Sequence, residues 1–471
     1  MQEPRQPGTP WRTPASVNGR VAIHAARPVA AHANPFDVSG PYAAAMRLAL
    51  ALALVPGLGT GLLLALVAGA HLPLAIAWPQ LAQAHGQIQT LGFVLTFIVA
   101  VGLQLFPRFL GSPLEHAQRA ARGSALVALA LIARLVGQPL APGPARAALL
   151  LFAAAGVAVG VLVAGSAFHG LRRPTPASSG EPAGSWRRFV LVGGLALGVA
   201  LGLGVWSGIV LTLGAPVVPV GLDEALIHLE LAGFATCLVF GVASRIFGRF
   251  LLLRTRPAFE RGVPRLAWSW ALGLLLVALG WLLDLTWSVW LRWLGSLIEL
   301  GVLVTWLWLA GLYQAPSRAS GTPYVTNPTR RWVRLAFAFL LLSLALSAGL
   351  FGREALLGVP PTITQLSAAR HALGQGFLMP LMVAMAVRML PMISADALKH
   401  RLGIEVILDL LLVGALLRVG AEYLGGYAGV AGPLLALGGT LGVIGFSLFA
   451  VAMWSSLGRL PNSRRRHVIH A

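Results

Sequence analysis

Twelve long apolar stretches, separated by short polar segments, run through most of the chain. Each is close to the length of about 20 residues that an α-helix needs to cross a bilayer. We therefore predict an all-α polytopic membrane protein with twelve transmembrane helices. The predicted helices lie at residues 44–70, 81–107, 120–139, 147–169, 188–213, 223–250, 265–285, 289–313, 333–352, 363–392, 403–424 and 430–456.

The composition agrees with this prediction and excludes a soluble globular domain. The chain is 57% hydrophobic and 11% charged, with a mean hydropathy of +0.78, far from the averages of soluble domains. The single cysteine, Cys237, lies within the sixth predicted helix. Neither a disulfide framework nor a thiolate-bound cluster is therefore expected.

A segment that starts with a histidine and contains a Gly-Phe pair occurs in the second, sixth and tenth predicted helices. The copies are His85 to Phe93, His228 to Phe234 and His371 to Phe377, and their Gly-Phe pairs are 141 and 143 residues apart. A period this long is too large for a solenoid repeat and indicates copies of a multi-helix unit. Twelve helices then form three four-helix units in a pseudo-threefold arrangement.

Segments rich in Pro, Ser, Thr and Gly separate these units. The membrane domain is expected to cover residues 41–457. Residues 1–40 are expected to form a disordered cytoplasmic tail, and residues 458–471 a basic cytoplasmic tail. The units are expected at about residues 41–170, 187–314 and 331–457.

The formal charge of +20 is distributed unevenly between the two predicted sides of the membrane. With both termini placed in the cytoplasm, all but six of the 35 Lys and Arg residues fall on the cytoplasmic side. This positive-inside pattern predicts a multi-pass protein of the cytoplasmic (inner) membrane of a prokaryote. The charge then serves contact with membrane lipids, and nucleic acid is not an expected partner. The six exceptions are Arg134, Arg146, Arg292, Arg353, Arg370 and Arg418.

The three histidines are expected in the outer third of the membrane, one to two turns into helices that run inward. A titratable side chain at that depth lines the bundle interior by default; a histidine that merely caps a carbonyl or touches lipid headgroups is the alternative. Aligned on the Gly-Phe pair, His228 and His371 match Gln87, whereas His85 lies two residues earlier, about 200° around the helix. If His85 and His371 face each other across a porphyrin, their neutral imidazoles are the two axial ligands of a low-spin haem. His228 is then a third metal-binding position.

Two neighbours of His371 extend this predicted site. Gln375 lies on the same helix face one turn further on, and Arg370 precedes His371 on the outer side. A planar guanidinium binds a carboxylate through two hydrogen bonds, so we expect Arg370 to hold a haem propionate, with Arg353 as a second candidate. An ordinary interface arginine is the alternative for both.

A twelve-helix chain with histidines near the outer ends of helices two, six and ten resembles subunit I of the haem-copper oxidases. Its motifs are closer to the NnrS family, membrane proteins related to that superfamily and implicated in the response to nitric oxide. Arg370 to Phe377, followed by Arg388, is similar to that family's Arg-His-Ala-Leu element, and His85 to Phe109 is similar to its His-Gly segment and Pro-Arg-Phe end. The resemblance implies a haem of b type and a role in nitric oxide tolerance or respiratory redox function. The resemblance also makes copper a candidate second cofactor and a respiratory-chain protein a candidate partner.

The chain also departs from the oxidases. They build their copper site from a histidine on helix six and a histidine pair on helix seven, whereas the seventh predicted helix, Leu266 to Trp287, contains no histidine. The tenth helix has one histidine where the oxidases have two. Reduction of oxygen or nitric oxide at a haem-copper centre is therefore disfavoured, and the sequence leaves open whether the protein is an enzyme. A small-molecule or ion transporter and a non-catalytic, oxidase-like assembly factor are the competing classes.

Overall fold

The computed structural model describes residues 39–457 except 71, 73–76, 170–183, 284, 316–327, 395–400 and 426–428. Within these residues the protein forms twelve continuous helices and no strand. The prediction of an all-α protein with twelve helices is therefore confirmed. The two predicted tails lie outside the described residues, apart from Ser39 and Gly40, which begin the first helix.

Four of the twelve helices contain a π-helical segment and are written as three elements each. The first helix is α1–η1–α2, the second α3–η2–α4, the sixth α8–η4–α9 and the tenth α13–η5–α14. In chain order the elements are α1 (Ser39–Leu52), η1 (Ala53–Leu58), α2 (Gly59–Gly69), α3 (Trp78–Gln87), η2 (Ile88–Leu95), α4 (Thr96–Leu110), α5 (Ala117–Gly137), α6 (Pro144–Ser166), α7 (Arg187–Thr212), α8 (Val220–His228), η4 (Leu229–Ala235), α9 (Thr236–Phe250), α10 (Phe259–Leu282), α11 (Ser288–Ala310), α12 (Pro328–Leu357), α13 (Ile363–His371), η5 (Ala372–Leu378), α14 (Met379–Ser394), α15 (Arg401–Leu424) and α16 (Ala431–Leu457).

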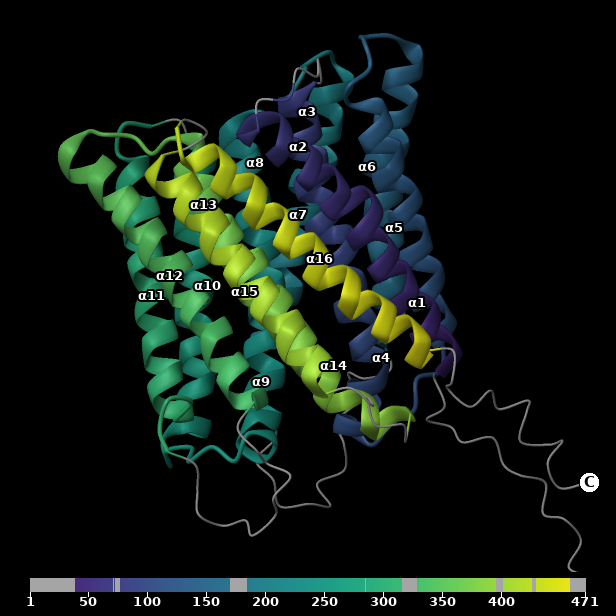
Figure 1. Cartoon of the computed structure of the whole chain (residues 1–471), viewed down its shortest axis with the longest axis vertical. Helices are drawn as coiled ribbons and strands as arrows, with labels where there is room; N and C mark the ends of the chain where they lie inside the picture. Colours follow the sequence, from purple (N-terminus) through teal and green to yellow (C-terminus); the bar gives the residue numbers. More distant parts are fainter. Residues whose placement is uncertain are drawn as a thin grey trace, which may run out of the picture.

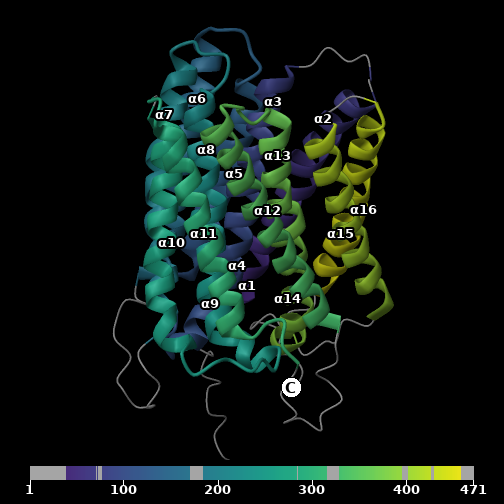
Figure 2. The ribbon, with the colours of Figure 1, turned by 90° about the vertical axis from the view of Figure 1, so that its left-hand side faces the viewer.

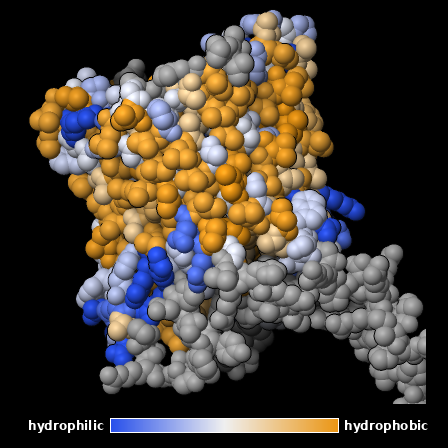
Figure 3. Space-filling model, viewed as in Figure 1, coloured by the Kyte–Doolittle hydropathy of each residue, from blue (hydrophilic) through white to orange (hydrophobic). Residues whose placement is uncertain are grey.

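The outer surface of the bundle is apolar. Ten of the described helices, all but the tenth and eleventh, are long and apolar enough to cross a membrane. Large apolar side chains such as Leu162, Leu195, Trp206 and Val451 are exposed on the outside. Figure 3 shows this surface as a broad apolar band across the middle of the molecule, with hydrophilic residues nearer its ends. Because a soluble monomer does not expose an apolar surface of this extent, the protein is a multi-pass membrane protein.

The second, sixth and tenth helices lie at the centre of the bundle. In the most apolar 18-residue window, 83% of the second helix and 78% of the sixth are buried, against 28% of α7. The segment η4 contacts both η2 and η5, so the three central π-helical segments meet. The other helices surround them: α5 and α6 lie at one edge and α11 at the opposite edge in Figure 1, and Figure 2 shows α15 and α16 on a further side.

Each central π-helical segment begins four residues before the glycine of a Gly-Phe pair. Packing explains these pairs. A Cβ atom at Gly233 would lie 2.7 Å from a side-chain carbon of α7, and one at Gly376 would lie 2.3 Å from the ring of Phe339. The phenylalanines of all three pairs are buried in the main hydrophobic core. The Gly-Phe pairs therefore let neighbouring helices approach, while the widened π-helical turns beside the histidines are a feature often found at functional sites.

Candidate functional site

A cavity of about 400 Å³ lies between the first, second, sixth, tenth, eleventh and twelfth helices. Of the residues that the sequence proposes for cofactor or metal binding, His85, Arg370, His371 and Gln375 all line it, and His228 does not. Most of the remaining wall is apolar. A volume of this order and an apolar wall with a few polar groups are typical of cofactor sites.

His85 is held by the first helix. It lies in the last turn of α3, and its Nδ1 atom is 2.9 Å from the backbone carbonyl oxygen of Gly57 in η1. The imidazole packs closely on Gly61, where a Cβ atom would lie 2.5 Å from His85 Cε1. A Cβ atom at Gly57 would lie 2.8 Å from Gln89 Nε2. The lack of a side chain at Gly61 therefore leaves room for the His85 ring, and the lack of one at Gly57 leaves room for the Gln89 amide.

His371 is held by the eleventh helix. It ends α13, and its Nδ1 atom is 2.9 Å from Glu422 Oε2 and 3.0 Å from the carbonyl oxygen of Ser367. The other oxygen of Glu422 accepts a hydrogen bond from Arg418 Nε at 3.3 Å, one turn earlier on α15. Only 1% of Glu422 is exposed. A buried carboxylate thus orients His371, as carboxylates often orient metal-ligating histidines.

These contacts decide the protonation of both rings. A backbone carbonyl oxygen only accepts hydrogen bonds, so the Nδ1 atoms of His85 and His371 carry the protons. In a neutral imidazole, Nε2 then has a lone pair. Within the described part of the chain, neither Nε2 atom has a hydrogen-bond partner. The cavity is therefore flanked by two imidazoles whose Nε2 atoms are available to a ligand.

The predicted arginines differ in position. Arg370 lines the cavity and forms an ion pair with Glu224 of α8, while its buried Nε atom has no partner among the described residues. Arg353 donates to Gln365 Oε1 at 2.9 Å near the C-terminal end of α12 and does not line the cavity. Gln375 packs against α16, where a Cβ atom at Gly442 would lie 2.6 Å from its Nε2. Arg370 and Gln375 are thus at the site, and Arg353 is outside it.

His228 lies in a second, smaller cavity of about 60 Å³. Its Nε2 atom is 2.9 Å from Glu299 Oε1 of α11, and the side chain of Glu299 is only 1% exposed. The Arg370–Glu224 ion pair lines both cavities, together with Ile227. The structure therefore does not bring His228 together with His85 and His371. Among the described residues there is no group of three or more His, Cys, Asp or Glu side chains arranged to hold a metal ion.

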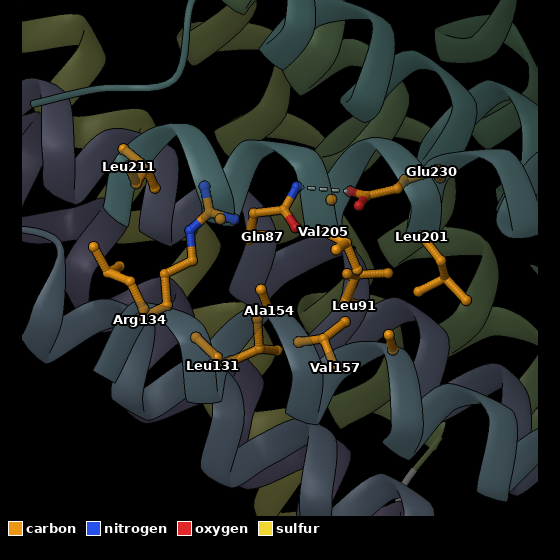
Figure 4. Close-up of a pocket in the computed structure, with 16 residues that line it drawn as sticks. Gln87, Leu91, Leu131, Arg134, Ala154, Val157, Leu201, Val205, Leu211 and Glu230 are labelled. Carbon is orange, nitrogen blue, oxygen red and sulfur yellow. Dashed lines mark hydrogen bonds between the residues drawn. The ribbon is translucent and has the colours of Figure 1, made fainter. Parts of the chain in front are cut away.

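A third buried polar cluster surrounds Glu230 at a cavity of about 30 Å³. One carboxylate oxygen accepts hydrogen bonds from Thr90 Oγ1 at 2.5 Å and from Gln87 Nε2 at 3.1 Å. The other oxygen has no partner among the described residues, and the same is true of Arg134 Nη2. Figure 4 shows Gln87 between Arg134 and Glu230. The cavity is large enough for one water molecule or two, which is the usual means of satisfying such groups.

The three positions that align in the sequence repeat are each hydrogen-bonded to a buried glutamate. Gln87, His228 and His371 each contact a buried glutamate, namely Glu230, Glu299 and Glu422. A carboxylate inside a membrane is costly without a partner, but the sequence does not show which histidine or amide each of these glutamates contacts. Arg418 and Glu422 stand four residues apart on a largely apolar helix, a spacing that places them on one face, and this was the available signal for their pairing.

Comparisons with known proteins report the fold and not the family. No family model matches the chain, and no curated protein sequence matches it. Among solved structures, a chain of a haem-copper terminal oxidase dimer, determined by cryo-electron microscopy, is similar with a TM-score of 0.66 and 14% sequence identity. The match covers 89% of this chain and 84% of the oxidase chain. The protein is thus a multi-pass membrane protein with a fold like that of haem-copper oxidase subunit I, as the sequence predicted.

Proposed function

We propose that this protein binds a b-type haem in the 400 Å³ cavity, where the Nε2 atoms of His85 and His371 would hold the iron. The observation that carries the proposal is that both rings are fixed through Nδ1 and line the same cavity. This is the arrangement expected of two neutral imidazoles that bind a metal through Nε2. A haem with two histidine ligands supplies one-electron transfer.

The other groups around the cavity fit the same ligand. The apolar wall suits a macrocycle, and the two arginines suit its carboxylates. Arg370 has a buried Nε atom with no partner in the described chain, and the guanidinium of Arg418 lines the same space. Arg370 and Arg418 would hold the carboxylates, His85 and His371 would orient the ring, and Gln375 would close the side next to α16.

Copper does not fit the third histidine. The Nε2 atom of His228 is already bonded to Glu299, and the described residues around it supply no further imidazole or thiolate. Divalent copper prefers several nitrogen or oxygen donors in a square arrangement. We therefore assign His228 to the hydrogen bond with Glu299 and leave copper out of the proposed site.

We also propose that the chain is built of three four-helix units. Two observations support this. The π-helical segments of the second, sixth and tenth helices start at the same position relative to their Gly-Phe pairs. Arg134 and Arg418 both lie 41 residues after the phenylalanine of such a pair, Phe93 and Phe377, and each donates to the residue four positions further on. The middle unit has Leu275 at that position.

The biological role that we propose is that of the NnrS type: nitric oxide response or tolerance, or respiratory redox function, in the inner membrane of a prokaryote with both termini in the cytoplasm. The sequence motifs around His85 and His371 support it, and the oxidase-like fold is compatible with it. A respiratory-chain protein as electron donor follows from the same proposal.

The optical spectrum of protein purified from haem-replete cells tests the site. We expect a Soret band in the wild type, its loss in His85→Ala and His371→Ala, and its retention in His228→Gln, which keeps a donor for Glu299. Size-exclusion chromatography of each variant reports folding. A colourless wild type, or an unchanged band in both alanine variants, would overturn the proposal and favour a transporter or an assembly factor.

A further inference from the structure

The two histidines that would hold the haem have different hydrogen-bond partners. His85 donates its Nδ1 proton to a neutral backbone carbonyl, that of Gly57 at 2.9 Å. His371 donates to the Glu422 carboxylate at 2.9 Å, and the carbonyl of Ser367 lies nearby at 3.0 Å. One ligand therefore has an uncharged partner and the other an anionic one.

An anionic acceptor changes the ligand itself. Hydrogen bonds to ionised groups are roughly twice as strong as neutral ones, so Glu422 draws the Nδ1 proton further than Gly57 does. The lone pair on the opposite nitrogen becomes more basic, as in other carboxylate–histidine pairs at metals. His371 is then the stronger electron donor of the two.

The surroundings preserve this effect. Glu422 is buried at 1% exposure, so water does not screen its charge. Its only cationic contact in the described chain is Arg418 Nε at 3.3 Å, a longer contact than the one to His371. The second arginine of the cavity, Arg370, is bound to Glu224 instead.

We propose that Glu422 is a positioning residue that lowers the reduction potential of the haem bound between His85 and His371, by accepting the Nδ1 proton of His371. The inference rests on the proposed function, since it concerns the same site. Ferric haem carries one more positive charge than ferrous haem, so an electron-rich ligand and a nearby anion favour the ferric form. Hydrogen bonding beyond the ligands is one of the means by which a protein sets such a potential.

Redox titration followed by the optical spectrum tests this in the full-length protein. We expect Glu422→Gln to retain the Soret band and to have a higher midpoint potential than the wild type. The low-spin ferric EPR spectrum is expected to show a wider spread of g values in the variant, because the ligand field of His371 is weaker. Glu299→Gln is the matched control: it alters the other His–Glu pair, at His228, and is expected to leave the midpoint potential unchanged.

The outcomes separate the two proposals. A wild type without haem overturns both. A wild type with haem, and the same midpoint potential and g values in Glu422→Gln, overturns the role of Glu422 and leaves the haem site standing. If Glu422→Gln does not retain haem, Glu422→Asp replaces it: the carboxylate is one methylene further from His371, and a potential equal to that of the wild type overturns the inference.

Discussion

His371 and His228 occupy the same position in two copies of one sequence motif, yet the protein surrounds them differently. Both precede a π-helical segment in a central helix, and both contact a buried glutamate at 2.9 Å. His371 uses Nδ1 for this contact, so that Nε2 is left for the 400 Å³ cavity; His228 uses Nε2 itself. The ring nitrogen that contacts the carboxylate therefore distinguishes a histidine with Nε2 available to a ligand from one whose Nε2 is already hydrogen-bonded.

The difference comes from the neighbouring helices. Glu422, the partner of His371, lies one turn of α15 away from Arg418. The first helix holds the second histidine of the cavity, His85, through Gly57 and Gly61. Around His228, α10 supplies Val277 and Trp281, and α12 supplies Ser343, Leu344, Ser347 and Phe351, so the cavity measures only about 60 Å³. The sequence motif thus places a histidine in a central helix, and the side chains of the surrounding helices determine whether a ligand fits beside it.

The largest effect is expected when the His228 pair is broken. In His228→Leu, Glu299 stays buried without a partner, which costs about 3–5 kcal/mol of unfolding free energy. Denaturant titration in detergent micelles measures it. The double variant His228→Leu/Glu299→Leu is expected to recover most of the loss, because hydrophobic residues replace buried pairs well. A single variant as stable as the wild type would show that Glu299 does not depend on its contact with His228.

The next prediction concerns the packing of His85 against Gly61 in the first helix. Gly61→Ala places a methyl group where His85 Cε1 is 2.5 Å away, and such overpacking costs about 1–3 kcal/mol. The ring must move, so the haem content per protein, measured by the pyridine haemochrome assay, is expected to fall. Gly59→Ala is the matched control, because its Cβ atom meets only a carbonyl oxygen at 3.4 Å. Equal haem content in both variants would show that His85 does not bind the haem.

The next prediction concerns Glu230, the third buried glutamate, and the hydrogen bond that it accepts from Thr90. Thr90→Val removes the hydroxyl that donates to Glu230 at 2.5 Å and is expected to lower the unfolding free energy by about 1.5–3 kcal/mol, since the acceptor is a buried carboxylate. Thr305→Val is the control, as that hydroxyl bonds only to its own helix at an exposed position. An equal loss in both would mean that Thr90 contributes no more than a local helix contact.

The smallest effect is expected at Arg353. Its contacts with Gln365 and Pro360 lie near the C-terminal end of α12, away from the cavity. Arg353→Gln is therefore expected to change the unfolding free energy by less than about 1 kcal/mol and to leave the Soret band as in the wild type. Arg370→Gln is measured in parallel. Loss of the band in Arg353→Gln would show that Arg353, and not Arg370, binds a haem carboxylate.

Most of the fold can be read from the sequence. Apolar stretches of about 20 residues leave the backbone no alternative to helices in a bilayer, because every N–H and C=O group must be bonded within the segment. The number of helices and the burial of the His-led helices follow from that pattern and from the repeat. The π-helical turns were not predicted, although each of the three central ones contains a Gly-Phe pair and the one in the first helix contains Pro56.

The site could be predicted only in part. The sequence by itself determined which imidazoles lie inside the membrane and that Arg370 and Gln375 accompany His371. The tertiary structure alone decided that Gly57 and Glu422 bind the Nδ1 atoms of His85 and His371, and that Glu299 takes Nε2 of His228. The physical reason is that periodicity places a side chain on a helix face, whereas the choice of ring nitrogen depends on atoms contributed by other helices.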